Sequence, residues 1–485
     1  MFLRVLVAAS ALALAQTAAA QPLFGNPLAD AAAYRTERGE TDEARFRARY
    51  EVTRIERGGA PIVSELVIDV ANDWSLTREG EIVVLRDFRL NRVFTIGGGH
   101  FTTMNGLADL TFRVMERQNR SYLQRITDLA TNRSELPDAC DAESELGIVI
   151  PGADGGATEL RERREIVTLR CNERDIGSLT PGDGPAPPAA FWPTMYAAMT
   201  THPALHRRAR ETGRAPGRLE TSHREVGGAV SRSWRLVAVE TVSVAYPLDA
   251  ASRNVTAEAL DQLVADAGQV GAEAVAGRAL GGAPTLESWT AHLREVSRRE
   301  GPAAAAMLLT PTFNMFPEIE CSGPQQHMTC DMVRNLRSLG DPAALAVMEI
   351  AIAEQQNDLA GAIAAMQRAQ RSPHGGHATL GASFALAVQR FNQEQLAQAR
   401  AANAPTDVAA LQNRALLAFP YNPAYWTDVG DRFAREYEWP SAFLFYDVAY
   451  ALPMPSAVAR NRALATKRQQ IERIRRDFPD AWLAV

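Results

Sequence analysis

Residues 422–453 have the sequence NPAYWTDVGDRFAREYEWPSAFLFYDVAYALP, and this stretch decides the expected fold of the C-terminal part. Asn422 is well placed to cap a helix, and Pro423 suits the first turn of that helix. Large apolar side chains recur at helical spacing on both sides of the Glu438-Trp439-Pro440 segment, and Pro453 closes the second run. The stretch therefore predicts two antiparallel helices.

A similar stretch begins about eighty residues earlier. Asp341 and Pro342 open a helix pair there in the way that Asn422 and Pro423 open the later one. Ala362 lies eleven residues before the closing Pro373, and Ala442 lies eleven residues before Pro453. This similarity predicts related helix pairs within 341–455.

The second stretch resembles a tetratricopeptide repeat, a helix pair with a pattern of large and small residues over about 34 positions. The matching residues are Trp426, Val429, Gly430 and Phe433 in the first helix and Ala442, Tyr446 and Ala449 in the second. The resemblance implies that Gly430 and Ala442 let the two helices approach closely while the large residues fill the core. It covers 341–455, although the first helix of the middle repeat, near 391–401, departs from the pattern. An ordinary helical bundle is the alternative.

The first twenty residues have the order of a signal peptide. Arg4 supplies a positive charge, an apolar run extends over 5–15, and small residues precede a cleavage site after Ala20. The apolar run is shorter than the roughly 20 residues that span a bilayer, and no later stretch is long and apolar enough for a membrane helix. We therefore expect an exported protein, periplasmic or secreted, without a transmembrane segment.

Residues 21–250 are expected to form an α+β domain with a mostly antiparallel sheet. Helices are expected at 108–129 and 191–210, and a loop at 182–188. The predicted strands are 45–57, 65–74, 81–88, 92–96, 159–172 and 234–244.

After Asn254 the chain is Ala-rich and helical in pattern. We expect a helical connecting region at 251–340 and an all-α tetratricopeptide-like domain at 341–485. The last helix, 457–478, either caps the repeats or forms a free arm. The whole sequence has 51 basic and 57 acidic residues, and its net charge of −6 argues against nucleic-acid binding. Lys467 is its single lysine.

Four cysteines favour disulfide bonds in an oxidising compartment. Three connectivities are possible, and local spacing favours Cys321 with Cys330 and Cys140 with Cys171. The spacings match neither a CxxC redox motif nor a zinc site, so we expect structural disulfides and no metal centre.

Histidines provide the main candidates for a metal site. His202 and His206 are four residues apart on an expected helix, and His223 is a conceivable third ligand. Pro203 instead suggests that His202 caps the helix. His374 and His377 occupy an expected loop that has no preorganised surroundings. His100 follows three glycines, which we interpret as a turn between strands.

Catalytic motifs are weak. The serine motif GxSxG is absent, and Ser144, Ser222, His223 and Glu225 have only sequence proximity in their favour. Glu318 and Glu320 would share one face of an extended segment, but acidic loop residues are common. The basic stretches 161–164 and 206–210, with Arg214 and Arg218, suit a solvated face better than a site for anionic lipid.

These observations predict a non-enzymatic interaction or scaffold protein of the cell envelope that binds a protein partner through its helical repeats. No catalytic residue and no cofactor is expected. One alternative is a carrier that holds a lipid or another apolar ligand in the N-terminal domain, with the sheet wrapped on a helix as a half-barrel. Another is a hydrolase whose residues carry no known motif.

Overall fold

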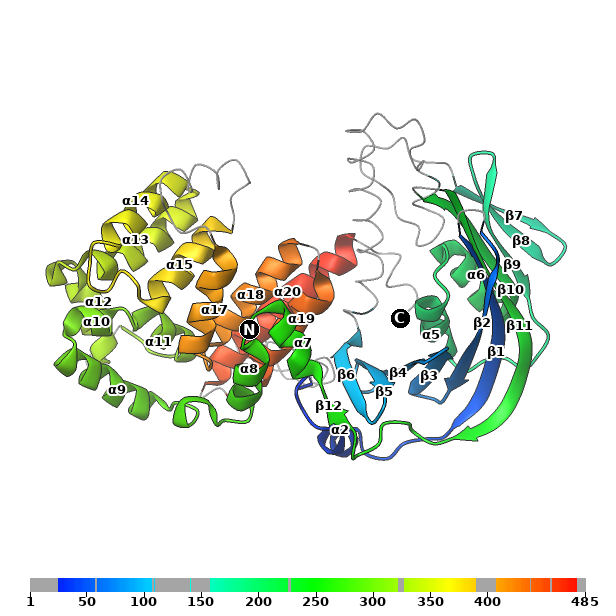
Figure 1. Ribbon diagram of the computed structural model, residues 1–485, viewed down its shortest axis with the longest axis horizontal. Helices are drawn as coiled ribbons and strands as arrows, with labels where there is room; N and C mark the ends of the chain where they lie inside the picture. The colour runs from blue at the N-terminus through cyan, green and yellow to red at the C-terminus, as the bar shows by residue number, and fades with distance from the viewer. Residues whose placement is uncertain are drawn as a thin grey trace, which may run out of the picture.

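The computed structural model describes residues 25–56, 59–106, 109, 140, 158–225, 228–321, 327–389, 407–436, 438–453 and 456–477. These residues form a large, mostly antiparallel sheet followed by a region of packed helices, so both the α+β part and the all-α part are present (Figure 1). The predicted signal peptide (1–20) and nearly all of the helix expected at 108–129 lie outside the described residues.

One sheet contains twelve strands in the order β12-β6-β5-β4-β3-β2-β1-β11-β10-β9-β8-β7. Its neighbouring strands are antiparallel except for β12 and β6, which are parallel. The bounds are β1 (Ala44–Glu56), β2 (Ile62–Val70), β3 (Trp74–Glu79), β4 (Ile82–Asp87), β5 (Arg92–Gly97), β6 (His100–Asn105), β7 (Thr158–Arg163), β8 (Ile166–Cys171), β9 (Arg174–Pro181), β10 (Pro216–Glu225), β11 (Gly228–Val244) and β12 (Arg253–Asn254).

The central strand β1 shows why the sheet has two unlike faces. Phe46, Ala48 and Tyr50 are buried, whereas Arg47 and Arg49 between them are partly exposed. Successive side chains of a strand point to opposite faces, so this alternation gives one apolar face and one polar face. We call the polar face of β1 and its neighbours the outer face.

Helices cover the sheet on both sides. α5 (Phe191–Ala198) and α6 (Pro203–Thr212) lie on the concave, apolar face in Figure 1, where the Phe191 and Phe46 rings have centroids 5.5 Å apart. α2 (Ala31–Arg38) covers the opposite face near β3–β6, where its Tyr34 shares a core with Trp74. Adjacent Ser75 points the other way and hydrogen-bonds with Thr194 of α5 at 2.6 Å.

Two expectations about this part of the chain were wrong. The stretch 159–172, predicted as one strand, is the β7–β8 hairpin, which turns at Arg164 with a φ of 59°. The stretch 191–210, predicted as one helix, forms α5 and α6, because Pro203 lacks an N–H and starts a new helix. Strands β3, β6, β9, β10 and β12 were not predicted; β10, for example, contains Leu219 as its single large apolar residue.

The remaining helices belong to the C-terminal part. Their bounds are α7 (Thr256–Leu263), α8 (Ala267–Val275), η2 (Ala279–Gly281), α9 (Leu286–Arg299), α10 (Pro302–Ala306), α11 (Leu309–Met315), α12 (Met328–Asn335), η3 (Leu336–Leu339), α13 (Pro342–Gln356), α14 (Leu359–Ala369), α15 (Ala378–Val388), α17 (Val408–Ala418), α18 (Pro423–Arg435), α19 (Trp439–Ala451) and α20 (Ala457–Asp477). As predicted, Asp341 caps α13 and Asn422 caps α18, each through a side-chain oxygen that accepts backbone N–H groups.

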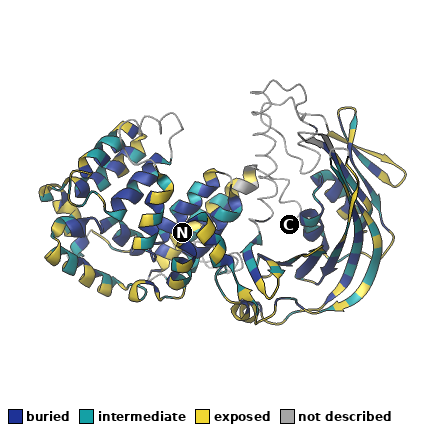
Figure 2. Cartoon of the chain, viewed as in Figure 1, coloured by how far each residue is buried: buried dark blue, intermediate teal, exposed yellow. Residues whose placement is uncertain are grey.

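Adjacent helices of this part pack in pairs: α13 with α14, α15 with α17, and α18 with α19. Between 378 and 418, α15 is therefore the described partner of α17, while the segment near 391–401 lies outside the described residues. Most of α19 is buried (Figure 2), in keeping with a sequence that is apolar except for a few positions such as Asp447. α20 packs on α18 and α19 through Ala459, Ala463, Lys467 and Ile471, so it covers the end of the stack and is not a free arm.

The connecting region is part of the same helical body. Leu260 of α7, Ala267 of α8 and Phe316 after α11 share one core with residues of α18 and α19. Helices α7 and α8 of the expected connecting region therefore pack directly on the last helices.

The sheet and the helices meet at a buried ion network. Arg92 of β5 donates to Asp447 of α19 at 3.0 Å, and Lys467 of α20 donates to the other oxygen of the same carboxylate. All three side chains are at most 1% exposed. Arg92 also donates to the Gly25 carbonyl at 2.6 Å and lies over the Tyr34 ring. Burial lowers the pKa of Lys467 to about 8, although Asp447 opposes the shift.

Both disulfides join the cysteines that the spacing had paired. Cys140 is bonded to Cys171 at the end of β8, and Cys321 is bonded to Cys330 in α12. The four cysteines are therefore all paired. No described helix is long and apolar enough to cross a membrane.

Replacing Gly430 with alanine is expected to lower the melting temperature. A Cβ at this position would lie 2.5 Å from the Tyr446 ring and 3.0 Å from the Ala442 carbonyl oxygen. Overpacking of this kind costs about 1–3 kcal/mol, more than the roughly 0.5–1 kcal/mol that alanine gains over glycine within a helix. Gly376→Ala is the control because its Cβ would meet open space. Equal melting temperatures for the two variants in thermal denaturation would contradict the close approach.

Asp447→Asn is expected to lower the free energy of unfolding by about 3–5 kcal/mol, because Arg92 and Lys467 would remain buried without their counter-ion. Urea denaturation would measure the change. Asp331→Asn is the matched control, since its ion pair with Arg334 is exposed and is expected to contribute about 0–1 kcal/mol. A similar loss of unfolding free energy in both variants would show that the buried network contributes no more to stability than an exposed ion pair does.

Candidate functional site

A row of polar side chains, four of them serine or threonine, crosses the outer face of the sheet. The row runs from Thr53 of β1 through Ser233 of β11, Glu220 of β10 and Ser178 of β9 to Thr168 of β8, each residue paired with the next across adjacent strands. Cross-strand partners point to the same face, so all five side chains lie together. All five are partly exposed.

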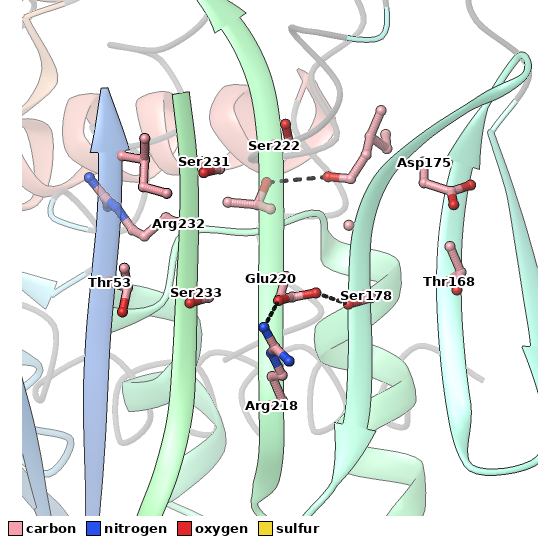
Figure 3. Close-up of a pocket in the computed structure, with 14 residues that line it drawn as sticks. Thr53, Thr168, Asp175, Ser178, Arg218, Glu220, Ser222, Ser231, Arg232 and Ser233 are labelled. Carbon is pink, nitrogen blue, oxygen red and sulfur yellow. Dashed lines mark hydrogen bonds and ion pairs between the residues drawn. The ribbon is translucent and has the colours of Figure 1, made fainter. Parts of the chain in front are cut away.

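The row lies along a hollow of about 540 Å³ in this face (Figure 3). Ser231 and Ser222, also cross-strand partners, continue the hollow on one side of the row, and Arg218 borders it on the other. Asp175 lies at its β9 edge. The volume falls in the range of about 300–1,000 Å³ that small-molecule sites occupy. We call this feature the hydroxyl hollow.

Side-chain size explains why the face is hollowed here. Further along the same strands, long charged pairs cover the backbone, as in Arg47–Asp69 at 2.5 Å and Arg49–Glu240 at 3.1 Å. Within the hollow the equivalent positions carry serine and threonine. The short side chains leave the space that arginine and glutamate fill elsewhere on this face.

Both carboxylates at the hollow are paired with arginines. Glu220 accepts a hydrogen bond from Ser178 at 2.7 Å and forms an ion pair with Arg218 at 2.6 Å. Asp175 pairs with Arg170 at 2.9 Å. The lining also includes Arg232, whose guanidinium hydrogen-bonds to Thr200 at 3.4 Å and lies over the Trp234 ring.

Serine and histidine neighbours on β10 do not form a catalytic pair. Ser222 is exposed on the outer face, whereas His223 is 3% exposed and faces the other side of the sheet. Ser144, the other serine considered, lies outside the described residues. The hydroxyl hollow can thus bind through hydrogen bonds, and this pair supplies it with no activated nucleophile.

The histidines considered for a metal site occupy different environments. His206 is buried in α6, where its Nε2 lies 2.9 Å from the Thr201 hydroxyl and its ring packs on Tyr196. Burial lowers the pKa of His206 to about 3. His202 caps α6: its Nδ1 accepts the Ala204 N–H at 3.1 Å. Within the described residues, no three histidine, cysteine or carboxylate side chains are placed to hold a metal ion.

The same histidine cap recurs at two other helices. Nδ1 of His327 accepts the Thr329 N–H at 3.4 Å at the start of α12, and Nδ1 of His377 accepts the Thr379 N–H at 3.2 Å at the start of α15. Burial lowers the pKa of both imidazoles; Arg294 adds to the shift for His327 and His374 for His377, whereas Glu300 opposes the latter. His377 thus has a structural role in the loop where a metal pair was considered.

The remaining candidate residues, His100, Glu318 and Glu320, are exposed at the surface. His100 is exposed beside the Gly98–Gly99 turn that joins β5 to β6. Glu318 and Glu320 are exposed before the Cys321–Cys330 disulfide.

The basic cluster at 206–210 is partly neutralised. Arg208 pairs with Glu162 of β7 at 2.8 Å and with Glu211 at 3.0 Å. These contacts agree with a solvated face.

The large residues that match the tetratricopeptide pattern lie in the core. Trp426, Val429, Phe433 and Tyr446 are at most 6% exposed. The indole of Trp426 donates to the Pro420 carbonyl at 2.9 Å. The smaller matching residues Gly430, Ala442 and Ala449 are buried as well. These residues serve packing and do not face a ligand.

Sequence reasoning missed the hydroxyl hollow. Its local signal is the alternation Ser231, Ser233 on β11 and Arg218, Glu220, Ser222 on β10. Such alternation is typical of any solvated strand, so only the cross-strand register distinguishes it.

Comparison with known proteins does not assign a family. No protein-family model matches the chain, and no curated protein matches it in sequence. Any functional proposal therefore has to come from the geometry of the chain itself.

Stability is expected to fall as the pH drops from about 7 to 5, because imidazole protonation removes the Nδ1 acceptors and places positive charge at helix N-termini. The pKa values of His327 and His377 are lower in the folded state than in the unfolded state. The two histidine caps therefore stabilise the fold fully above the unfolded-state pKa of about 6.5, and this contribution is lost as the pH falls below it. In a double variant, His327→Asn with His377→Asn, asparagine still caps both helices but does not titrate. The free energy of unfolding of this variant should therefore fall less between pH 7 and pH 5, by a difference of at most about 1 kcal/mol per cap.

Urea denaturation at several pH values would measure this slope. His100→Asn is the control, because His100 is exposed and caps no helix. An unchanged slope in the double variant would contradict the role of the caps.

Proposed function

We propose that this protein is an exported, non-enzymatic interaction protein of the cell envelope that binds a protein partner on its stacked helices. The observation that carries the proposal is the continuous packing of helix pairs from α13 to α19, closed by α20. Stacked helix pairs of this kind offer an extended surface in place of a deep pocket, which suits protein partners. The resemblance of 422–453 to a tetratricopeptide repeat supports the same role.

Export is supported by two features. The two disulfides suit an oxidising compartment outside the cytoplasm. The first twenty residues have the composition and order of a cleavable signal. The periplasm is the compartment that we propose.

A fixed geometry between the two parts favours a scaffold. The Arg92–Asp447–Lys467 network is fully desolvated, so bending at the junction would expose or separate buried charges. We therefore expect the sheet and the helices to keep one relative orientation, so that a partner bound to the helices is held in a defined place relative to the sheet.

The contacts of α5 and α6 with the sheet favour interaction over apolar-ligand transport. Phe191, Met195 and Leu205 pack directly on Phe46 and its buried neighbours. Side chains thus fill the space between these helices and the central strands. A carrier would need that space for its ligand.

Site-specific photo-cross-linking in cells would test the proposal on the full chain. A photoreactive residue would replace Ile352 of α13, which is 44% exposed, or exposed Arg414 of α17. A discrete cross-linked protein is expected from both positions. Val237 of β11, 51% exposed on the sheet, is the matched control and should give none.

A surface substitution distinguishes a specific partner from proteins that cross-link by chance. Ile352→Glu is expected to reduce partner recovery about tenfold with little change in melting temperature, because the side chain is exposed. Deletion of 341–455 is unsuitable, since it would remove Asp447 from the buried network. The absence of any discrete product from both helical positions would overturn the proposal.

A further inference from the structure

We propose that the hydroxyl hollow binds an uncharged, polyhydroxylated ligand, namely a linear oligosaccharide that lies across the strands. The proposal is independent of the proposed partner surface on α13 and α17, which belongs to the helical part. It depends on three properties of the hollow: its hydroxyl lining, its paired charges and the direction of its central row.

The lining suits a ligand rich in hydroxyl groups. Ser222, Ser231 and Ser233 each bear a hydroxyl that can rotate to donate or to accept, while Ser178 donates to Glu220 and can still accept. A sugar hydroxyl has the same freedom, so the two sets can match without a fixed order of donors and acceptors. Peptide groups are less adaptable, because each N–H only donates and each carbonyl only accepts.

The paired charges at the hollow disfavour an anionic ligand. Arg218 already pairs with Glu220, and Arg170 with Asp175, so neither arginine offers an uncompensated charge to a phosphate or carboxylate. The two carboxylates would in addition repel an anion. Glu220 retains acceptor capacity beyond its bonds to Ser178 and Arg218, and a carboxylate that accepts from hydroxyls forms strong hydrogen bonds.

The central row sets the orientation and length of the ligand. Thr53, Ser233, Glu220, Ser178 and Thr168 lie on five adjacent strands. Adjacent strands are about 4.8 Å apart, so the row spans roughly 19 Å perpendicular to the strands. A chain of several sugar units would meet a polar side chain at each strand. Figure 3 shows these side chains on successive strands.

Affinity is expected to be weak, with a Kd of about 1 mM, because an open polar hollow offers hydrogen bonds that water also satisfies. Saturation-transfer NMR detects such binding and suits a protein of this size. The probe is the N-acetylglucosamine tetramer, which bears hydroxyl and amide groups. Saturation transfer to this probe is expected at about 10 mM ligand.

Two substitutions test whether the tetramer binds in the hydroxyl hollow. Glu220→Gln removes the central charge, and Ser233→Val removes a hydroxyl while keeping a residue that suits a strand. Each should weaken binding about fivefold or more. Thr241→Val is the matched control, because Thr241 is exposed on the same strand β11 outside the hollow, and it should bind as the parent does.

Three results would overturn the inference. The first is no saturation transfer to the tetramer. The second is transfer that Glu220→Gln and Ser233→Val leave unchanged. The third is tighter binding of glucose 6-phosphate than of the tetramer, which would contradict the charge argument. Folding of each variant is checked by its melting temperature, which should match that of the parent because both replaced side chains are partly exposed.

Discussion

The buried contact of Arg92 with Asp447 and Lys467 is the constraint on which the relation between sheet and helices depends. Three charged groups without access to water are tolerable only when each keeps its partners in place. Arg92 belongs to β5, Asp447 to α19 and Lys467 to α20, so one carboxylate connects three elements. The single lysine of the chain is used here, beneath the surface, where it closes the helical stack against the sheet.

Around this junction the two parts meet different packing demands. The sheet covers its apolar face with α5 and α6, and α2 covers the opposite face near β3–β6, while the outer face of β1, β10 and β11 is partly exposed to water. Long ion pairs occupy most of the central outer face, and short hydroxyl side chains occupy one region of it. The helices reach close contact through small residues such as Gly430, and α19 is enclosed by its neighbours. The proposed functions use different surfaces: the helical stack for a protein and the hydroxyl hollow for a sugar chain.

Sequence patterns predicted local features well and boundaries less well. The period-two pattern of 45–57 corresponds to β1, and the caps Asp341 and Asn422 start α13 and α18. Both disulfide pairs followed from spacing. The stretch 159–172 was misassigned because the β7–β8 turn is formed by Arg164 and Glu165 and contains none of the Gly, Pro, Asn or Asp residues that usually mark a turn. The hydroxyl hollow gave no usable signal, since serines and threonines on solvated strands are common.

By itself, the sequence determined what depends on neighbours along the chain: helix starts, strand alternation, the order of an α+β part before an all-α part, and the packing residues of 422–453. Only the tertiary structure decided which distant residues meet. Thr53 and Ser233 become cross-strand partners although 180 positions separate them, and Arg92 meets Asp447 across 355 positions. The physical reason is that capping and periodicity act within a few residues, whereas strand register and the partners of buried charges are set by packing over the whole molecule.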